Sequence, residues 1–377
     1  MLLLEMEKSA GEAVTVAVRT EALTQLLAEL DVIPGVSGAE EEVAEFVTGE
    51  LEGCFDAFHR DALGNRFFTK QGTNPQLNLM LSAHMDEVGF VIHHVDEKGF
   101  GYFTPVGLHD DRTLANQVLT VHTEKGPIQG LTGGKPAHIV SKEETQKAPP
   151  ISEIYLDFGT TSCEETEELG VRVGDYVTFE RPGRLLNSGR LFTGKAVDDR
   201  AGVAVLIEVM RRLKDVEVHA NVHAVATVQE EVGIRGAGPA AFRVKPDVAL
   251  AIDVTLAGGT PGIEDRQLPV KLGEGPAIKF FDWAPNLGMI GNNVPKRLTS
   301  RLVAVAEDHD IPYQREVLFN GATDAWSMSL SGEGVATGTI SLPSRYIHSA
   351  VGCVCPEDLA GAVDLISAFA EEFKEPL

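Results

Sequence analysis

Five segments of this chain have the apolar or β-prone pattern of a strand and end in Asp, Glu or His residues. The pair Glu230 and Glu231 follows an alternating apolar run and precedes Gly233. Four other apolar or β-prone segments end in the same residue types: His84 with Asp86, Asp198 with Asp199, Asp253, and His348. Taken alone, two adjacent acids are more often a solvated strand edge than a reactive site. Because the pattern recurs, we interpret the opening pair as one metal ligand and one base.

These residue types match the needs of a hydrolytic site with two cations. Such a site takes a few imidazoles, several carboxylates and one bridging carboxylate, with the cations about 3.5–4 Å apart. In open α/β sheets, ligands collect outside the carboxyl ends of the strands, where we place His84, Asp253 and the glutamate pair. The alternative is glycoside hydrolysis, in which two carboxyl groups face each other across about 5–9.5 Å. Neighbouring strand residues point in opposite directions, so Glu230 and Glu231 suit that geometry poorly.

The length, composition and net charge of the chain limit the classes of protein to which it can belong. The chain has 377 residues, of which 43% are hydrophobic, and no apolar run approaches the length of about 18 that a membrane span requires. Its 32 basic and 56 acidic residues give a formal charge of -24. This excess repels nucleic-acid phosphates and anionic lipid, so we expect neither nucleic acid nor membrane as a partner.

The start of the chain and the cysteines indicate the compartment. Residues 1–8 contain acids after three leucines, with no basic region and no small-residue cleavage site, so a cytoplasmic protein is expected. The four cysteines lack the spacing of a zinc knuckle and are too few for a disulfide framework, which favours reduced thiols. Any metal would therefore be held by histidines and carboxylates.

Helical and strand patterns alternate at both ends of the chain. Helices are predicted over residues 19–31 and 37–51, the second with Ser37 as its N-cap. Apolar residues after Asp199 mark one helix face, and residues 221–228 then alternate as a strand. Pro356 marks the start of a terminal helix with acids in its first turn. This rhythm predicts an α/β fold.

The middle of the chain has a different pattern. Between about residues 88 and 190, short β-type runs alternate with Gly-rich turns and show little helical periodicity. We interpret this range as an inserted, mostly β domain. The α/β catalytic domain would then be discontinuous, formed by residues 1–87 and 191–377.

The ordered motifs resemble those of the tetrahedral aminopeptidases, the glutamyl and deblocking aminopeptidase family of co-catalytic metallopeptidases. The resemblance covers nearly all of the chain after the first twenty or so residues. It is carried by the segments 34–38, 84–86, 133–138, 197–200, 228–233, 252–255, 321–324 and 345–349.

The resemblance implies a set of ligands for two divalent cations, zinc or cobalt. Asp198 would bridge the two ions. His84 and Asp253 would complete one site, and Glu231 and His348 would complete the other.

It also implies roles for the residues beside these ligands. Glu230 would be the general base, and Asp86 would orient His84. Asp199 would not ligate, and its peptide bond to Asp198 would be cis. Relatives usually carry Glu at the position of Gly352, a departure that concerns substrate fit or loop packing rather than metal binding.

The implied protein is an aminopeptidase that removes residues from the free N-terminus of short peptides. Its implied fold is a mixed-sheet α/β, phosphorylase/hydrolase-like catalytic domain with a small β insertion that pairs subunits into dimers. Six dimers would close into a tetrahedral dodecamer. The alternatives are a deacylase or carboxypeptidase of the same clan, and a scaffold without activity. The sequence leaves the preferred N-terminal residue open.

Four further residues have less specific expectations. Lys135 and His138 could line a substrate path or belong to a turn, and Asp324 is expected to support the site. Arg345 could bind a peptide carboxylate or carbonyl, or form an internal ion pair. Seven further histidines lack a paired ligand motif and are expected to be surface or strand residues: His93, His94, His109, His122, His219, His223 and His309.

Overall fold

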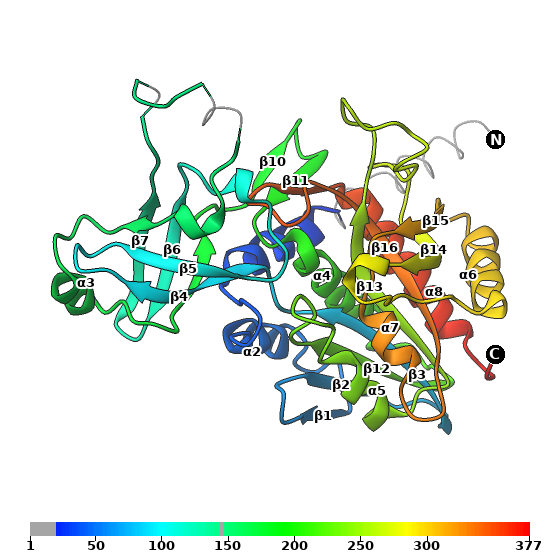
Figure 1. Cartoon of the computed structure of the whole chain (residues 1–377). Helices are drawn as coiled ribbons and strands as arrows, with labels where there is room; N and C mark the ends of the chain where they lie inside the picture. The colour runs from blue at the N-terminus through cyan, green and yellow to red at the C-terminus, as the bar shows by residue number, and fades with distance from the viewer. Residues whose placement is uncertain (1–19, 137, 143–146) are drawn as a thin grey trace.

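The computed structural model describes residues 20–136, 138–142 and 147–377, and it consists of a large mixed sheet with helices beside a small barrel (Figure 1). Within these described residues, no helix is long and apolar enough to cross a membrane. The mixed-sheet α/β fold class with a small β unit is as predicted.

The large sheet has eleven strands. Nine follow in the order β1-β2-β12-β3-β13-β16-β17-β11-β10, and β14 and β15 extend from β16. Their bounds are Ala57–Arg60 (β1), Arg66–Lys70 (β2), Asn74–His84 (β3), Arg184–Leu186 (β10), Leu191–Gly194 (β11), Ala220–Thr227 (β12), Val248–Leu256 (β13), Ala277–Trp283 (β14), Gln314–Phe319 (β15), Ala336–Arg345 (β16) and Gly352–Val354 (β17).

The centre of this sheet is parallel and buried on both faces. β12, β3, β13 and β16 run parallel to one another. Eight of the nine residues of β13 are buried, which agrees with its nearly continuous apolar sequence. Parallel neighbours bring their carboxyl ends to one edge, so polar residues that follow these strands meet there.

Helices cover both faces of the sheet (Figure 1). On one face of the sheet, a larger apolar core is formed with the helical residues 20–32 and four further helices. On the other face, a smaller apolar core is formed with two short helices. The first four are Glu41–Glu50 (α2), Val197–Leu213 (α4), Lys296–Asp308 (α6) and Pro356–Glu372 (α8), and the two short ones are Ala237–Val244 (α5) and Asp324–Ser329 (α7).

Local predictions succeeded for most of these elements. The apolar face predicted after Asp199 is the buried face of α4, and α8 begins at Pro356. The predicted cap at Ser37 is wrong, because α2 begins at Glu41 and its N-cap residue is Glu40. The hydroxyl of Ser37 instead donates a hydrogen bond to a carboxylate of the candidate site.

The small barrel closes in the order β4-β5-β8-β7-β6-β9. Its strands are Gly89–Val95 (β4), Gly101–Val106 (β5), Val118–Thr123 (β6), Gly126–Thr132 (β7), Leu156–Asp157 (β8) and Tyr176–Phe179 (β9), and helix α3 spans Cys163–Leu169. The barrel has its own apolar core around Phe90 and Phe103. β10 pairs with β11 of the large sheet. The boundaries at residues 88 and 190 stay predictions.

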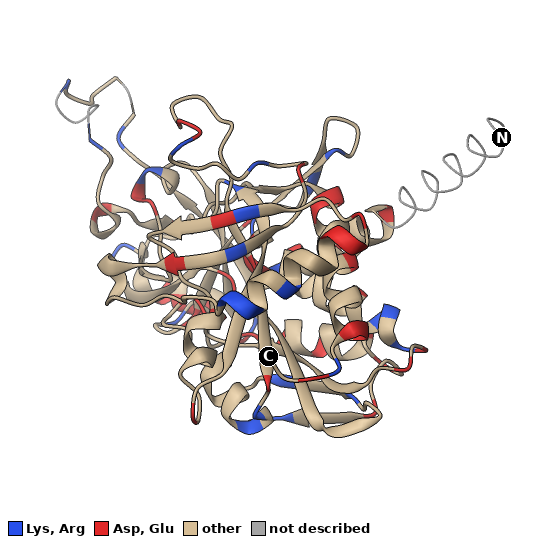
Figure 2. Cartoon of the chain, turned by 90° about the vertical axis from the view of Figure 1, so that its right-hand side faces the viewer, with Lys and Arg blue, Asp and Glu red and all other residues tan. Residues whose placement is uncertain are grey.

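Asp and Glu residues occur along helices and loops, with Lys and Arg residues between them (Figure 2). The acidic residues in this view are therefore distributed over several elements rather than gathered on one.

Candidate metal centre

The predicted ligands lie at the carboxyl edge of the parallel strands. His84 is the last residue of β3 and is paired in register with Thr227, the last residue of β12. Glu230 and Glu231 follow β12 after a short turn, while Asp253 lies near the end of β13. The sheet therefore brings residues from distant parts of the sequence to one place.

Two further ligands reach this edge from α4 and from the turn after β16. Asp198 stands in the first turn of α4, where it and Asp199 leave helical geometry, and the peptide bond between them is cis, as the resemblance implied. His348 follows β16 by three residues and has a positive φ of 58°.

The carboxylate of Asp198 lies between two imidazoles. Its Oδ1 atom is 3.1 Å from Nε2 of His84, and its Oδ2 atom is 3.2 Å from Nε2 of His348. The same His84 nitrogen lies 3.8 Å from Oδ1 of Asp253, and the His348 nitrogen lies 3.3 Å from Oε1 of Glu231. Each imidazole thus faces Asp198 and one further carboxylate.

The other nitrogen of His84 fixes the orientation of its ring. Nδ1 lies 3.0 Å from the backbone oxygen of Asp86 and 3.5 Å from Oδ1 of the Asp86 side chain. Since a backbone oxygen can only accept, Nδ1 donates this hydrogen bond, which turns Nε2 toward Asp198, where it would be the nitrogen available to a cation. This is the arrangement found behind histidines that bind metals.

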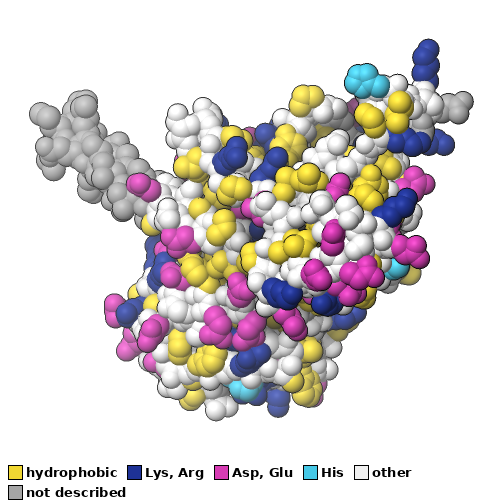
Figure 3. All heavy atoms as spheres, turned by 90° about the vertical axis from the view of Figure 1, so that its left-hand side faces the viewer, with side chains coloured by type: hydrophobic (Ala, Val, Ile, Leu, Met, Phe, Trp, Pro, Cys, Tyr) yellow, Lys and Arg dark blue, Asp and Glu magenta, His cyan; other side chains and the backbone are white. Residues whose placement is uncertain are grey.

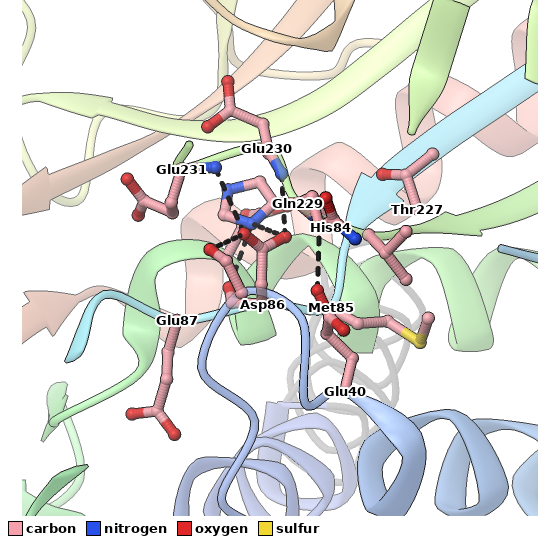
Figure 4. Close-up of polar contacts among 12 residues, drawn as sticks. Glu40, His84, Met85, Asp86, Glu87, Thr227, Gln229, Glu230 and Glu231 are labelled. Atoms are coloured by element: carbon pink, nitrogen blue, oxygen red, sulfur yellow. Dashed lines mark hydrogen bonds and ion pairs between the residues drawn. The ribbon is translucent and has the colours of Figure 1, made fainter. Parts of the chain in front are cut away.

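Asp86 also holds the turn that carries the glutamate pair (Figure 4). Its carboxylate accepts from the backbone N–H groups of Glu230 at 3.0 Å and Glu231 at 3.1 Å, and from the hydroxyl of Ser37 at 2.6 Å. The two glutamate side chains point in different directions from this turn (Figure 4). One buried carboxylate therefore positions both glutamates and His84.

Glu40 supports the same turn from the start of α2. Its carboxylate accepts from the backbone N–H groups of Gly38 at 2.8 Å and Gln229 at 3.1 Å (Figure 4). Gln229 has a φ of 57°, a left-handed conformation that non-glycine residues adopt uncommonly. The contact with Glu40 stabilises this conformation, which directs the next two residues toward the site.

The side chain of Arg200 links three backbone segments that lead to the candidate ligands. Its buried guanidinium donates hydrogen bonds to the backbone oxygens of Met85, Leu30 and Ile33. Arg200, two residues after Asp198, thereby joins the start of α4 to the end of the helical residues 20–32 and to the end of β3.

Burial and mutual repulsion perturb the carboxyl groups of this centre. Burial raises the pKa of Glu230 and of Asp253 well above the usual range, and the negative charges of neighbouring carboxylates raise both further. Burial would lower the pKa of His348, but the charge of Glu231 and a hydrogen bond to Asp198 raise it to about 11. A cluster of buried carboxyl groups of this kind is stabilised by a positively charged group or ion bound between them.

The donor set fits divalent cations. Ligand atoms of His84, Asp198 and Glu231 lie within 4.8 Å of one another, as do those of His84, Asp199 and Asp253. Oε1 of Glu231 is buried and has no hydrogen-bond partner within the described part of the chain, as expected for an atom directed at an ion. Two imidazoles with several carboxylates are ligands that zinc and other divalent first-row metals accept.

A cavity of about 1030 Å³ opens above these residues. Among its lining residues are the candidate ligands and Glu230, together with parts of the barrel loop at 108–112 and of the loop at 320–323. The residues are thus accessible to a ligand of peptide size from solvent.

The model of the M42 glutamyl aminopeptidase family matches residues 64–365 of this chain. The chain belongs to that family. It is therefore a peptide-bond hydrolase, and the resemblance drawn from the motifs is confirmed.

Individual relatives agree with this membership. The lysyl aminopeptidase of Pyrococcus furiosus is 34% identical and aligns over 93% of this chain and 97% of its own length. The structure of an aminopeptidase from Desulfurococcus kamchatkensis has a TM-score of 0.88 with 39% identity, covering 94% of this chain and 95% of that one. The TET1 peptidase of Pyrococcus horikoshii has a TM-score of 0.83 with 34% identity, covering 93% and 100%.

The structure places the less specific predicted residues as follows. Asp324 accepts a hydrogen bond from Thr227 at 2.7 Å, which is a supporting contact as expected. Arg345 donates to the backbone oxygens of Gly258 and Gly259, and of its two expected roles the internal ion pair is not seen within the described residues. Asp199 is buried close to His84 and Asp253, and one of its oxygens accepts from the N–H of Gly202 at 3.0 Å.

Gly352 occupies a tight position in this M42 member. It pairs with Gly194 in the sheet, and a Cβ atom added there would lie 3.1 Å from Cβ of Val197. Val197 immediately precedes Asp198, so a larger residue at 352 would press on the segment that carries the predicted bridging carboxylate.

Sequence reasoning missed two contributors, Glu40 and Lys279. Glu40 falls within the helix predicted over residues 37–51, next to the motif at 34–38, and nothing in this local pattern indicates its contact with Gln229. Lys279 lines the cavity from β14 and is fully buried. A lysine at a strand position flanked by apolar residues is the signal that could have drawn attention to it.

Proposed function

We propose that this M42 member is a metal-dependent aminopeptidase that removes single residues from the free N-terminus of short peptides. The observation that carries the proposal is the position of Asp198, whose two oxygens lie 3.1 and 3.2 Å from the imidazoles of His84 and His348, each of which also faces one further carboxylate. One bridging carboxylate with a ligand pair on each side is the arrangement that a dinuclear hydrolytic centre needs.

The ligand assignment divides the residues into two sites around Asp198. His84 and Asp253 form one pair, and Glu231 and His348 form the other, in agreement with the distances given above. Two divalent cations, with zinc or cobalt proposed, would supply Lewis acidity toward the scissile carbonyl and toward water when bound.

Glu230 is proposed as the general base. It lines the cavity beside the ligand set, and its backbone is fixed by Asp86. Its carboxylate accepts a proton from the attacking water and delivers it to the leaving amine, so one residue serves both halves of the hydrolysis. Asp86 acts on the reaction only by positioning His84 and the glutamate turn.

The carboxylate-rich cavity favours a substrate that carries a free amine. Charged ammonium groups are stabilised by nearby carboxylates, whereas an acetylated amine brings no charge and leaves buried acceptors unpaired. The loss amounts to about 1–3 kcal/mol of binding free energy. Blocked peptides are therefore expected to be poor substrates.

An assembly of subunits is part of the proposal. The Pyrococcus horikoshii relative is described as assembling into a tetrahedron or a large octahedral shell. Residues 88–190 expose apolar side chains, among them Val173 and Ile139. Apolar side chains are also visible between charged ones on the face shown in Figure 3. We propose that this insertion pairs subunits into dimers and that six dimers form a dodecamer in the cytoplasm.

Hydrolysis of matched peptides tests the function. One peptide sequence is prepared with a free N-terminus, with an acetylated N-terminus and with a blocked C-terminus, and the released amino acids are measured. Release from the N-terminus of the free and C-blocked peptides, abolished by a chelator and restored by zinc or cobalt, is expected. Equal rates on the acetylated peptide would favour the deacylase alternative, release from the C-terminus would favour a carboxypeptidase, and absence of bound metal and turnover would favour the scaffold.

A further inference from the structure

A buried ion pair lies outside the candidate ligand set and takes no part in the proposed chemistry. Nζ of Lys195 lies 2.6 Å from Oε1 and 2.7 Å from Oε2 of Glu87, so both oxygens of the carboxylate are engaged. The side chains of Lys195 and Glu87 are 5% and 1% exposed. Glu87 points away from Glu230 and Glu231 (Figure 4). The pair is therefore separate from the residues that would hold the cations.

The ion pair joins two segments that carry predicted ligands. Glu87 stands three residues after His84, the last residue of β3. Lys195 stands three residues before Asp198, between β11 and α4. Nε2 of His84 and Oδ1 of Asp198 lie 3.1 Å apart. The spacing between the predicted bridging carboxylate and one of its imidazoles therefore depends on how the ion pair holds the two segments.

Further contacts fix both members of the pair. Oε1 of Glu87 also accepts from the N–H of Gly35 at 3.2 Å, and the N–H of Glu87 donates to the backbone oxygen of Gly35 at 2.9 Å. Oδ1 of Asp31 accepts from the N–H of Ala196 at 2.9 Å. A Cβ atom at Gly194 would lie 2.2 Å from this Asp31 oxygen, so the close approach requires glycine. The segment that leads into α4 is thereby held from two sides.

Buried ion pairs contribute little to the stability of a fold. Moving two charges out of water costs free energy that their attraction only partly recovers, so well-packed neutral side chains of similar volume are often equally or more stable. Charge-assisted hydrogen bonds with two acceptor oxygens do, however, add geometric specificity. Functional side chains need such placement, to within about 0.5 Å. An ion pair between two ligand-bearing segments therefore suits positioning better than stabilisation.

We propose that the ion pair between Lys195 and Glu87 positions the metal centre by holding Asp198 at the spacing from His84 that a bridging carboxylate requires. The inference rests on the proposed metal-dependent function and adds to it two positioning residues that touch neither metal nor substrate. Loss of the pair should weaken metal binding while the fold is kept.

A neutral double variant tests this role. Glu87→Gln with Lys195→Met removes both charges at similar volume and keeps a side-chain oxygen for the N–H of Gly35. Affinity for zinc is measured by competition with a chromogenic chelator, and the denaturant midpoint of unfolding is measured on the metal-free protein. Zinc affinity is expected to fall roughly tenfold or more, the size usual for residues that support ligands. The metal-free midpoint is expected to equal or exceed that of the wild type.

The ion pair between Arg211 and Glu50 provides the matched control. It also ties α4 to another element, α2, but at the opposite end of α4 from Asp198. Glu50→Gln with Arg211→Met is expected to keep the wild-type affinity for zinc. Three results would overturn the positioning role: wild-type affinity in the first double variant, equal loss of affinity in both double variants, or parallel losses of affinity and metal-free stability in the first.

Glu87→Asp keeps the proposal testable if the neutral double variant does not fold. Its charge is retained, but the carboxylate is one methylene shorter, so the contact with Lys195 must lengthen or the two segments must move. Zinc affinity should fall, and the visible spectrum of the cobalt form should change, because His84 and Asp198 shift relative to each other. Unchanged affinity and spectrum would overturn this inference alone. A wild-type protein that binds neither zinc nor cobalt would overturn the proposed function as well.

Discussion

The Oδ1 atom of Asp86 accepts a hydrogen bond from the backbone N–H of Glu230 across 3.0 Å. The same carboxylate lies behind His84, so the proposed base and a proposed ligand share one support. Hydrogen bonds from His84 and Ser37 outweigh the effect of burial and lower the pKa of Asp86, which keeps this support ionised. A change at Asp86 should therefore disturb both metal binding and turnover.

Asp86→Asn should reduce metal affinity and activity by about 10–100-fold, the usual cost of removing a partner behind a ligating histidine. The amide side chain cannot accept from both glutamate N–H groups and the Ser37 hydroxyl at once. Elemental analysis after dialysis and kcat/KM on a free peptide measure the two effects. Asp96→Asn is the matched control, since Asp96 also accepts from backbone N–H groups but lies in the barrel. Equal losses in the two variants would argue against a special role for Asp86.

The assembly is tested by light scattering. Twelve chains of 40.5 kDa give a particle of about 490 kDa, and activity should elute with that particle. A stable and active monomer at micromolar concentration would refute the proposed dodecamer.

A partly buried histidine on β12, outside the candidate ligand set, gives a pH dependence of stability. Burial lowers the pKa of His223 on β12 from 6.5 to about 4, while its nitrogens contact Thr69 and Asn78. As the pH falls below about 6.5, His223 binds a proton in the unfolded chain but stays unprotonated in the folded chain. The contribution of His223 to the free energy of unfolding is therefore fully present above pH 6.5 and is lost as the pH falls toward 4.

His223→Gln removes this titration. Between pH 7 and pH 4.5, the free energy of unfolding of the wild type should fall more steeply than that of the variant, by on the order of 1–2 kcal/mol. Chemical denaturation of both proteins at equal protein and metal concentrations measures the difference. Parallel pH curves would show that His223 does not contribute.

Much of the site could be predicted from the sequence because its ligands follow strands. The apolar runs before His84, Glu230 and Asp253 predict parallel strands, and parallel strands place their carboxyl ends together. The other predicted ligands, Asp198 and His348, came from the resemblance to the family, because no local sequence pattern indicates that they lie near His84, Glu231 and Asp253.

The unpredicted parts depend on contacts between segments that are distant in sequence. Ser37 has the sequence context of a helix cap, but its hydroxyl donates to Asp86, 49 residues away. Lys279 and Glu316 meet because β14 pairs with β15, a pairing that no periodicity reveals. The positive φ of Gln229 is likewise set by a carboxylate from another element.

The division of labour between Glu230 and Glu231 tests the central claim most directly. A general base contributes about 10²–10⁴-fold to the rate without holding the metal, whereas loss of a carboxylate ligand weakens metal binding itself. Glu231 faces His348 across 3.3 Å within the predicted ligand set, whereas Glu230 lines the cavity from the same turn. The two substitutions to glutamine should therefore fail in different ways.

The decisive measurement is metal content and turnover of Glu230→Gln and Glu231→Gln, side by side, with and without added zinc or cobalt. Glu230→Gln should keep both metals and bind product-like inhibitors, yet lose nearly all turnover, and added metal should not restore it. Glu231→Gln should lose metal first and regain part of its activity when metal is in excess. An active Glu230→Gln, or full metal with a near-normal rate in both variants, would contradict the account.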